Sequence, residues 1–199
     1  MIFSVRRSSA TLLVCLSMLL ISSCSAQQQG QSDDFTLQSV TGPVSLSDLR
    51  GQIVLLFFGY THCPDVCPAT MNNVASALRQ LDTTDAKRVK VLFVTVDPER
   101  DSAEHLAKYL SFFNPDFIGL TGSPQAIKKT TAQYDVELFI EGDNKSDSYE
   151  VMHSSLLFLI NGDGKIADVM SHHTEPDDIA IALRKWLNLL PLANAKSSD

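Results

Sequence analysis

The sequence is short of cysteine and of basic residues, and each shortage excludes a class of protein. Its 199 residues include only 4 cysteines, too few for a small fold that is held together mainly by disulfides. Lysine and arginine total 16 against 23 acidic residues, so the formal net charge is −7 and no basic surface is expected for a nucleic-acid backbone. We therefore expect an acidic globular protein with no nucleic-acid partner.

Long apolar runs are also scarce, and the one near the N-terminus is typical of an export signal. Arg6 and Arg7 precede an apolar segment at 10–21 that is too short to span a membrane comfortably. The segment leads into LISSC, which resembles the lipobox of bacterial lipoproteins and implies cleavage before Cys24 and acylation of Cys24. A plain secretory cleavage after Ala26 and an uncleaved anchor helix are alternatives, and all three export the protein.

These features divide the chain into four segments. We predict a lipoprotein signal peptide at 1–23, a lipidated N-terminus with a flexible tether at 24–34, one folded domain at 35–191 and a disordered tail at 192–199. The lipid would hold the protein on the periplasmic side of a bacterial membrane. The sequence leaves open whether this is the inner or the outer membrane.

The folded segment alternates strand and helix patterns. Continuous apolar runs at 52–60 and 89–97 are typical of strands covered on both faces, and helical spacing follows each of them. Alternating residues around a turn at 35–46 predict an N-terminal β-hairpin, and a strand at 150–160 leads into a second hairpin and a last helix at 175–190. This order predicts an α/β fold with a central, mostly parallel sheet flanked by helices, and it resembles the thioredoxin fold.

The stretch FGYTHCPDVCPAT contains a closely spaced pair of cysteines. With Cys15 in the signal peptide and Cys24 acylated, Cys63 and Cys67 are the thiols that remain in the folded domain. Pro68 predicts that the next helix begins there with Cys67 as its cap, where unpaired N–H groups lower a thiol pKa. A disulfide, a redox pair and a soft-metal site all fit this spacing, although a structural disulfide across so short a loop adds little stability.

Four motifs carry a resemblance that covers about 35–190. In order they are LLFFGYTHCPDVCP, VTVDPERD, FIGLTGSP and EVMHSSLLFLINGDGK. They are similar to the Sco/SenC family of copper-binding assembly proteins. The resemblance implies that Cys63, Cys67 and His153 bind one copper ion per chain, as Cu(I) or Cu(II), and that Asp97 lies near the metal.

The same resemblance implies a task in the assembly of cytochrome c oxidase. The protein would deliver copper to the dinuclear copper site of subunit II, or keep the thiols of that site reduced. A periplasmic copper donor and a thiol reductant are then expected as further partners, because the cysteines must be reduced before they bind metal.

The side chains themselves agree with copper. Thiolates are soft ligands that suit Cu(I), imidazole suits copper in general, and closed structural zinc sites use four protein ligands rather than three. His153 precedes a buried strand at the place where thioredoxins carry a proline beside their active-site cysteines. A histidine there favours a metal ligand over the substrate-binding turn of a redox enzyme.

Two carboxylates and another histidine lie near these residues in the sequence. Asp97 would either orient His153 or the copper ion, or cap the turn before Pro98, whereas capping of the next helix is favoured for Asp101. His62 is not assigned as a ligand, because neighbouring side chains of an extended segment point apart.

A thiol enzyme and a copper store are the alternatives. A peroxidase of the peroxiredoxin type needs a threonine three residues before its reactive cysteine, where Tyr60 and Pro64 stand instead, so we do not expect one. A periplasmic thiol-disulfide oxidoreductase using the same two thiolates stays open, so enzymatic activity is undecided. A store would need more soft ligands. We interpret His105 and the adjacent His172 and His173 as solvated, and assign no role to the acidic loop at 141–150.

Overall fold

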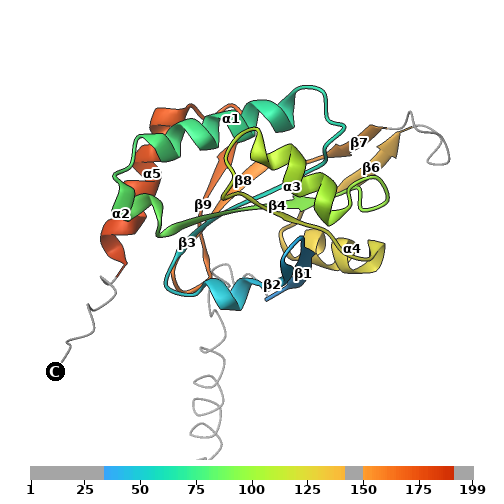
Figure 1. Ribbon diagram of the computed structural model, residues 1–199, viewed down its shortest axis with the longest axis horizontal. Coiled ribbons are helices and arrows are strands. Elements are labelled where there is room, and N and C mark those ends of the chain that lie inside the picture. Colours follow the sequence, from blue (N-terminus) through green and yellow to red (C-terminus); the bar gives the residue numbers. More distant parts are fainter. Residues whose placement is uncertain (1–33, 142–149, 191–199) are drawn as a thin grey trace, which may run out of the picture.

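The apolar runs of the sequence form one mixed β-sheet in the computed structural model, which describes residues 34–141 and 150–190 (Figure 1). In spatial order its strands are β5 (Ile118–Leu120), β4 (Val89–Thr95), β3 (Ile53–Gly59), β8 (Leu156–Ile160) and β9 (Ile166–Ser171). β3 pairs in parallel with β4, and β4 with β5, whereas β8 runs antiparallel to both β3 and β9. The carboxyl ends of β3, β4, β5 and β9 therefore lie at one edge of this sheet.

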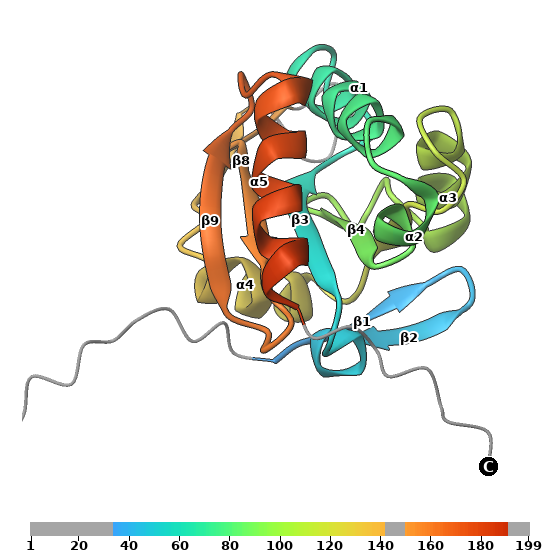
Figure 2. The ribbon, with the colours of Figure 1, turned by 90° about the vertical axis from the view of Figure 1, so that its left-hand side faces the viewer.

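Helices cover both faces of the sheet (Figure 2). One face carries α1 (Val66–Arg79), α3 (Ala103–Ser111) and α5 (Pro176–Leu189). The other face carries α4 (Pro124–Gln133) and the hairpin of β1 (Thr36–Ser39) and β2 (Gly42–Ser45). The predicted α/β architecture with its N-terminal hairpin is confirmed, and the sequence patterns missed two short elements, η1 (Leu46–Leu49) and α2 (Thr83–Ala86).

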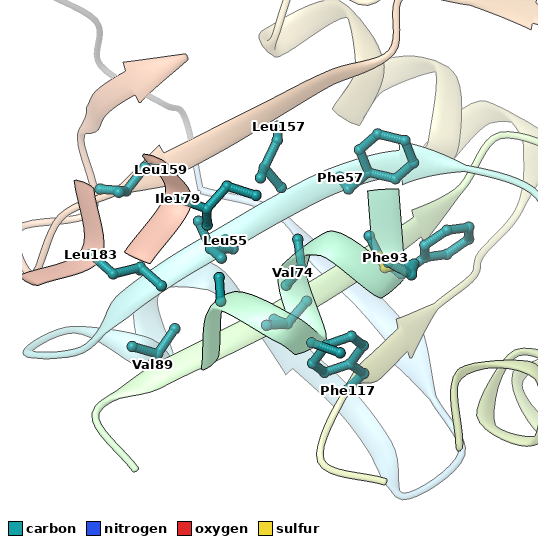
Figure 3. Packing of buried hydrophobic residues seen from close by; sticks show 14 of the residues in the cluster. Leu55, Phe57, Val74, Val89, Phe93, Phe117, Leu157, Leu159, Ile179 and Leu183 are labelled. Carbon is teal, nitrogen blue, oxygen red and sulfur yellow. The ribbon is translucent and has the colours of Figure 1, made fainter. Parts of the chain in front are cut away.

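β3 is buried along its whole length because it lies in the middle of the sheet. Leu55 and Phe57 point to the face of α1 and α5, where they belong to the same packed cluster as Val74 and Ile179 (Figure 3). Phe58 points to the opposite face and packs in the second cluster. Full burial of each such side chain contributes about 1.5–3 kcal/mol, which explains why this run contains no polar residue.

The helix after the cysteine pair begins earlier than the sequence predicts. α1 starts at Val66 with Asp65 as its N-cap, so the prediction that Pro68 opens the helix with Cys67 as cap is wrong. Pro68 falls in the first helical turn, whose N–H groups have no partner within the helix, so its missing N–H breaks no hydrogen bond.

The predicted strand at 150–160 is divided between two sheets. β7 (Glu150–His153) pairs antiparallel with β6 (Leu138–Glu141) in a separate two-stranded sheet, with His153 opposite Leu138. Two serines follow, and β8 then begins at Leu156 in the main sheet. The break brings the end of β7 close to the start of β8.

Several predicted segments lie outside the described residues. They are the signal peptide at 1–23, the tether at 24–34 apart from Asp34, the tail at 192–199 and most of the acidic loop at 141–150. These assignments stay predictions. Within 34–141 and 150–190, no helix has the length and hydrophobicity needed to cross a membrane.

Candidate metal centre

The two cysteines lie together at the carboxyl edge of the sheet. β3 ends at Gly59, Cys63 follows in the connecting loop, and Cys67 lies in the first turn of α1. The backbone N–H of Cys67 donates a hydrogen bond to the Cys63 sulfur at 3.4 Å, and neither cysteine forms a disulfide. Cys63 is half-buried and Cys67 is fully buried, so solvent or a partner reaches the pair from the Cys63 side.

Gly59 makes room for the buried sulfur. A Cβ at this position would lie 2.9 Å from the Cys67 sulfur, 2.8 Å from the Phe93 ring and 2.9 Å from the Phe57 ring. These separations are shorter than van der Waals contact, so only glycine fits where the end of β3 passes the thiol.

The buried cysteine holds its proton more tightly than a free thiol. A hydrogen bond from the Cys67 thiol to Cys63 raises the pKa of Cys67, and burial and the negative charge that develops on Cys63 raise it further. The prediction of a lowered thiol pKa is therefore wrong for Cys67, because these effects exceed the contribution of the helix N-terminus. In the metal-free protein Cys67 is a neutral thiol.

Asp101 anchors the cysteine loop to the neighbouring strand. Its buried carboxylate accepts hydrogen bonds from the backbone N–H of Thr61 at 3.0 Å, the Thr61 hydroxyl at 2.5 Å and the Thr95 hydroxyl at 2.7 Å. The predicted capping role is wrong, since the N-cap of α3 is Ser102, whose hydroxyl accepts from the N–H of His105. One signal for this contact is visible in the sequence. Thr61 follows β3 and Asp101 follows β4, and the carboxyl ends of these adjacent parallel strands lie side by side.

Asp97 is also buried, and its carboxylate forms an ion pair with Arg100. The Arg100 guanidinium in turn lies 5.9 Å from the centre of the ring of Tyr60, which is buried. Asp97 therefore supports the residues that precede Cys63 through Arg100. Whether it also orients His153 or a metal ion stays a prediction.

The backbone brings His153 to the same edge of the sheet as the cysteines. β7 ends at His153, β8 begins after two further residues, and Leu157 of β8 pairs with Phe57 of β3, just before the cysteine loop. In Figure 1 the β3–α1 connection and the β6–β7 pair lie at the same end of the molecule. The side chain of His153 is outside the described part of the structure.

The other histidines form two pairs. The exposed rings of His62 and His105 lie nearly parallel, 6.2 Å apart between centroids. The rings of the half-buried His172 and the exposed His173 lie 3.8 Å apart after β9. Among the described side chains, no group of three histidine, cysteine or acidic residues is arranged to hold a metal ion.

Comparison with known proteins gives the family. The family model described as SCO1/SenC matches residues 24–188. The chain is 34% identical over 159 residues to a mouse protein, "Protein SCO2 homolog, mitochondrial", covering 79% of this chain and 62% of the mouse protein. The chain spans about three fifths of the length of the first curated relatives it matches.

Solved structures agree in fold. Bradyrhizobium japonicum ScoI, solved with copper bound, is 35% identical with a TM-score of 0.71, covering 77% of this chain and 98% of that one. BsSco, described as having a disulfide switch and as a member of the Sco family of cytochrome c oxidase assembly proteins, is 25% identical with a TM-score of 0.64, covering 81% of this chain and 96% of that one. The present chain therefore belongs to the SCO1/SenC family.

Proposed function

We propose that this protein is an exported copper chaperone for cytochrome c oxidase. One copper ion would be held by the sulfurs of Cys63 and Cys67 and by the imidazole of His153. The protein would deliver that ion to the dinuclear copper site of subunit II, or keep the thiols of that site reduced. Copper is then its cargo rather than a resident cofactor.

The observation that carries this proposal is the pair of neighbouring thiols, not joined in a disulfide, at the edge of the sheet where the backbone of His153 also lies. Two sulfurs and one imidazole form a soft donor set that suits copper, and they leave an open position through which the ion can pass to an acceptor. The partly exposed Cys63 faces that exchange, while the buried Cys67 stays in place. Further support comes from ScoI, a relative that was solved with copper bound.

Export and anchoring belong to the same proposal. Acylation of Cys24 after removal of 1–23 would hold the domain at the periplasmic side of a membrane, through the tether at 24–34. A periplasmic copper donor and a thiol reductant would serve it there, because thiols in an oxidising compartment need a reductant before they bind metal.

A thiol-disulfide oxidoreductase is the second candidate. The hydrogen bond between the Cys67 N–H and the Cys63 sulfur keeps the two thiols close, which also suits reversible disulfide formation. The half-buried Cys63 would attack the partner disulfide, and Cys67 would then resolve the mixed disulfide. Two electrons and the two thiol hydrogens would pass to the partner.

Copper titration of the reduced protein tests the proposal. Cys15 and Cys24 are replaced by serine, so that the thiols of the folded domain are the only ones present. Absorption and EPR spectra should show one copper ion per chain with thiolate-to-copper(II) bands. Cys67→Ser should abolish these bands, and His153→Ala should weaken binding by roughly tenfold or more, whereas the exposed His173→Ala should leave it unchanged.

The same set of variants can also contradict the copper-chaperone proposal. A protein that binds no copper, but reduces a partner disulfide at the same rate with and without His153, would be a thiol oxidoreductase. A disulfide-exchange assay on the same set of variants makes this distinction.

A further inference from the structure

We propose that His62 and His105 form a surface site that captures a copper ion and passes it to Cys63. This inference rests on the copper-binding function proposed above and adds an entry point to it. His62 lies in the cysteine loop and His105 in the first turn of α3. Both side chains are exposed, and their rings face each other with 6.2 Å between centroids and 11° between planes.

The hydrogen bonds around Thr61 determine which nitrogen of His62 carries the proton. The Thr61 hydroxyl donates its only hydrogen to Oδ1 of Asp101, at 2.5 Å, because an ionised carboxylate can only accept. Nδ1 of His62 lies 3.2 Å from the same hydroxyl oxygen. That oxygen must therefore accept from the Nδ1–H of His62.

Neutral His62 consequently keeps its free lone pair on Nε2. Histidines that bind metals commonly donate their other N–H to a hydrogen-bond acceptor, which fixes the orientation of the ring. The chain from Asp101 through Thr61 to His62 supplies this arrangement at an exposed position. His62 is thus prepared as a ligand on the surface of the cysteine loop.

His105 offers the second nitrogen. Two imidazoles that share one ion bring their ligating nitrogens within about 4 Å of each other, since each bond is about 2.0 Å long. The exposed ring of His105 faces that of His62, so rotation about the His105 side-chain torsions can bring the two ligating nitrogens to that separation. Imidazole nitrogen suits copper, and two such ligands with water give a weak site from which the ion is easily released.

Transfer to the thiols is then a ligand exchange between adjacent residues of the cysteine loop. His62 directly precedes Cys63, so their Cα atoms are about 3.8 Å apart. The Cys63 sulfur bonds to the ion as a copper–imidazole bond breaks, the thiol proton passes to solvent, and the oxidation state of the copper does not change. The pair of His172 and His173 has no cysteine beside it in the sequence and serves as the comparison.

The experiment removes every other proposed ligand. The full chain is prepared with Cys15, Cys24, Cys63 and Cys67 replaced by serine and with His153→Ala. Of its 5 histidines this protein keeps the two pairs. Copper(II) is titrated and followed by EPR, in this protein and after adding His62→Ala with His105→Ala, or His172→Ala with His173→Ala. Circular dichroism checks that each protein is folded.

We expect weak binding of one copper ion with nitrogen hyperfine structure. It should be lost with His62→Ala and His105→Ala and kept with His172→Ala and His173→Ala. Absence of binding, or binding that survives the first pair of substitutions, overturns the proposal. In a second set, which keeps Cys63, Cys67 and His153, His62→Ala with His105→Ala should slow copper loading about tenfold without changing its final stoichiometry.

The second set also separates this inference from the proposed function. An unchanged loading rate overturns only the entry site, because copper still reaches the thiols. A protein with all its ligands that takes up no copper overturns both proposals.

Discussion

The hydroxyl of Thr61 donates a 2.5 Å hydrogen bond to Asp101, although the two residues are 40 positions apart in the sequence. The contact joins the cysteine loop to the connection between β4 and α3, and the backbone N–H of Thr61 donates to the same carboxylate. Because Thr95 at the end of β4 also donates to Asp101, one buried carboxylate fixes the loop relative to the sheet. The position of Cys63 depends on this link.

Asp101→Asn should lower the free energy of unfolding by about 1–3 kcal/mol. The amide presents one oxygen where the carboxylate presents two, so at least one of the donors of Thr61 and Thr95 faces an NH₂ group in a buried site. Urea denaturation measures the change. Asp65→Asn is the matched control, because this exposed residue of the same loop forms no side-chain hydrogen bond as N-cap and should change stability by less than about 0.5 kcal/mol. Equal stability of the two variants would contradict the role of Asp101.

Gly59→Ala should disturb both stability and the thiol pair. The new methyl group would lie within 2.9 Å of the Cys67 sulfur and of two aromatic rings, and overpacking of this kind costs about 1–3 kcal/mol. Gly122→Ala is the control, since the nearest atom there is the flexible end of Leu37 at 3.1 Å. Thermal unfolding together with the rate of thiol labelling tests this. A Gly59→Ala protein that matches the control in both measurements would show that the end of β3 has more room than the structure indicates.

Two ion pairs, each between residues three positions apart in the sequence, should contribute differently to the free energy of unfolding. Asp97 and Arg100 are 3% and 13% exposed, whereas Asp85 and Arg88 are 27% and 20% exposed. Asp97→Asn leaves the charge of Arg100 in a poorly solvated place and should cost about 3 kcal/mol, while Asp85→Asn should cost less than about 1 kcal/mol. Chemical denaturation at matched salt concentrations measures both, and similar losses would be the contrary result.

The stability of the metal-free protein should fall at alkaline pH because of Cys67. Its pKa is raised from 9.0 in the folded protein, first by the hydrogen bond with Cys63 and then by burial, so above about pH 9 the unfolded chain loses a proton that the folded chain keeps. The unfolding free energy then decreases as pH rises, by up to about 1.4 kcal/mol per pH unit for one proton. Cys67→Ala should remove this contribution. An identical pH dependence in both proteins would mean that Cys67 ionises as readily when folded.

The architecture can be predicted from the amino-acid sequence alone. A central strand buries both of its faces, so the unbroken apolar run at 53–59 predicts a strand in the middle of the sheet. Helical spacing of apolar residues identifies the helices that cover this sheet. The cysteine pair and its position after this strand were also visible, because they depend on residues that are close in the chain. The family motifs added His153, which no local pattern assigns.

How the cysteine loop is held depends on contacts that form only when the chain has folded. α1 can start at Val66 because Pro68 then falls in the first helical turn, where its missing N–H breaks no hydrogen bond. The neutral state of Cys67 follows from its contact with Cys63 and from burial. Likewise, a sequence cannot show that Asp101 accepts from Thr61 rather than capping α3, since both uses satisfy a carboxylate equally well. Such choices depend on which groups meet after the chain has folded, and they involve residues distant in sequence.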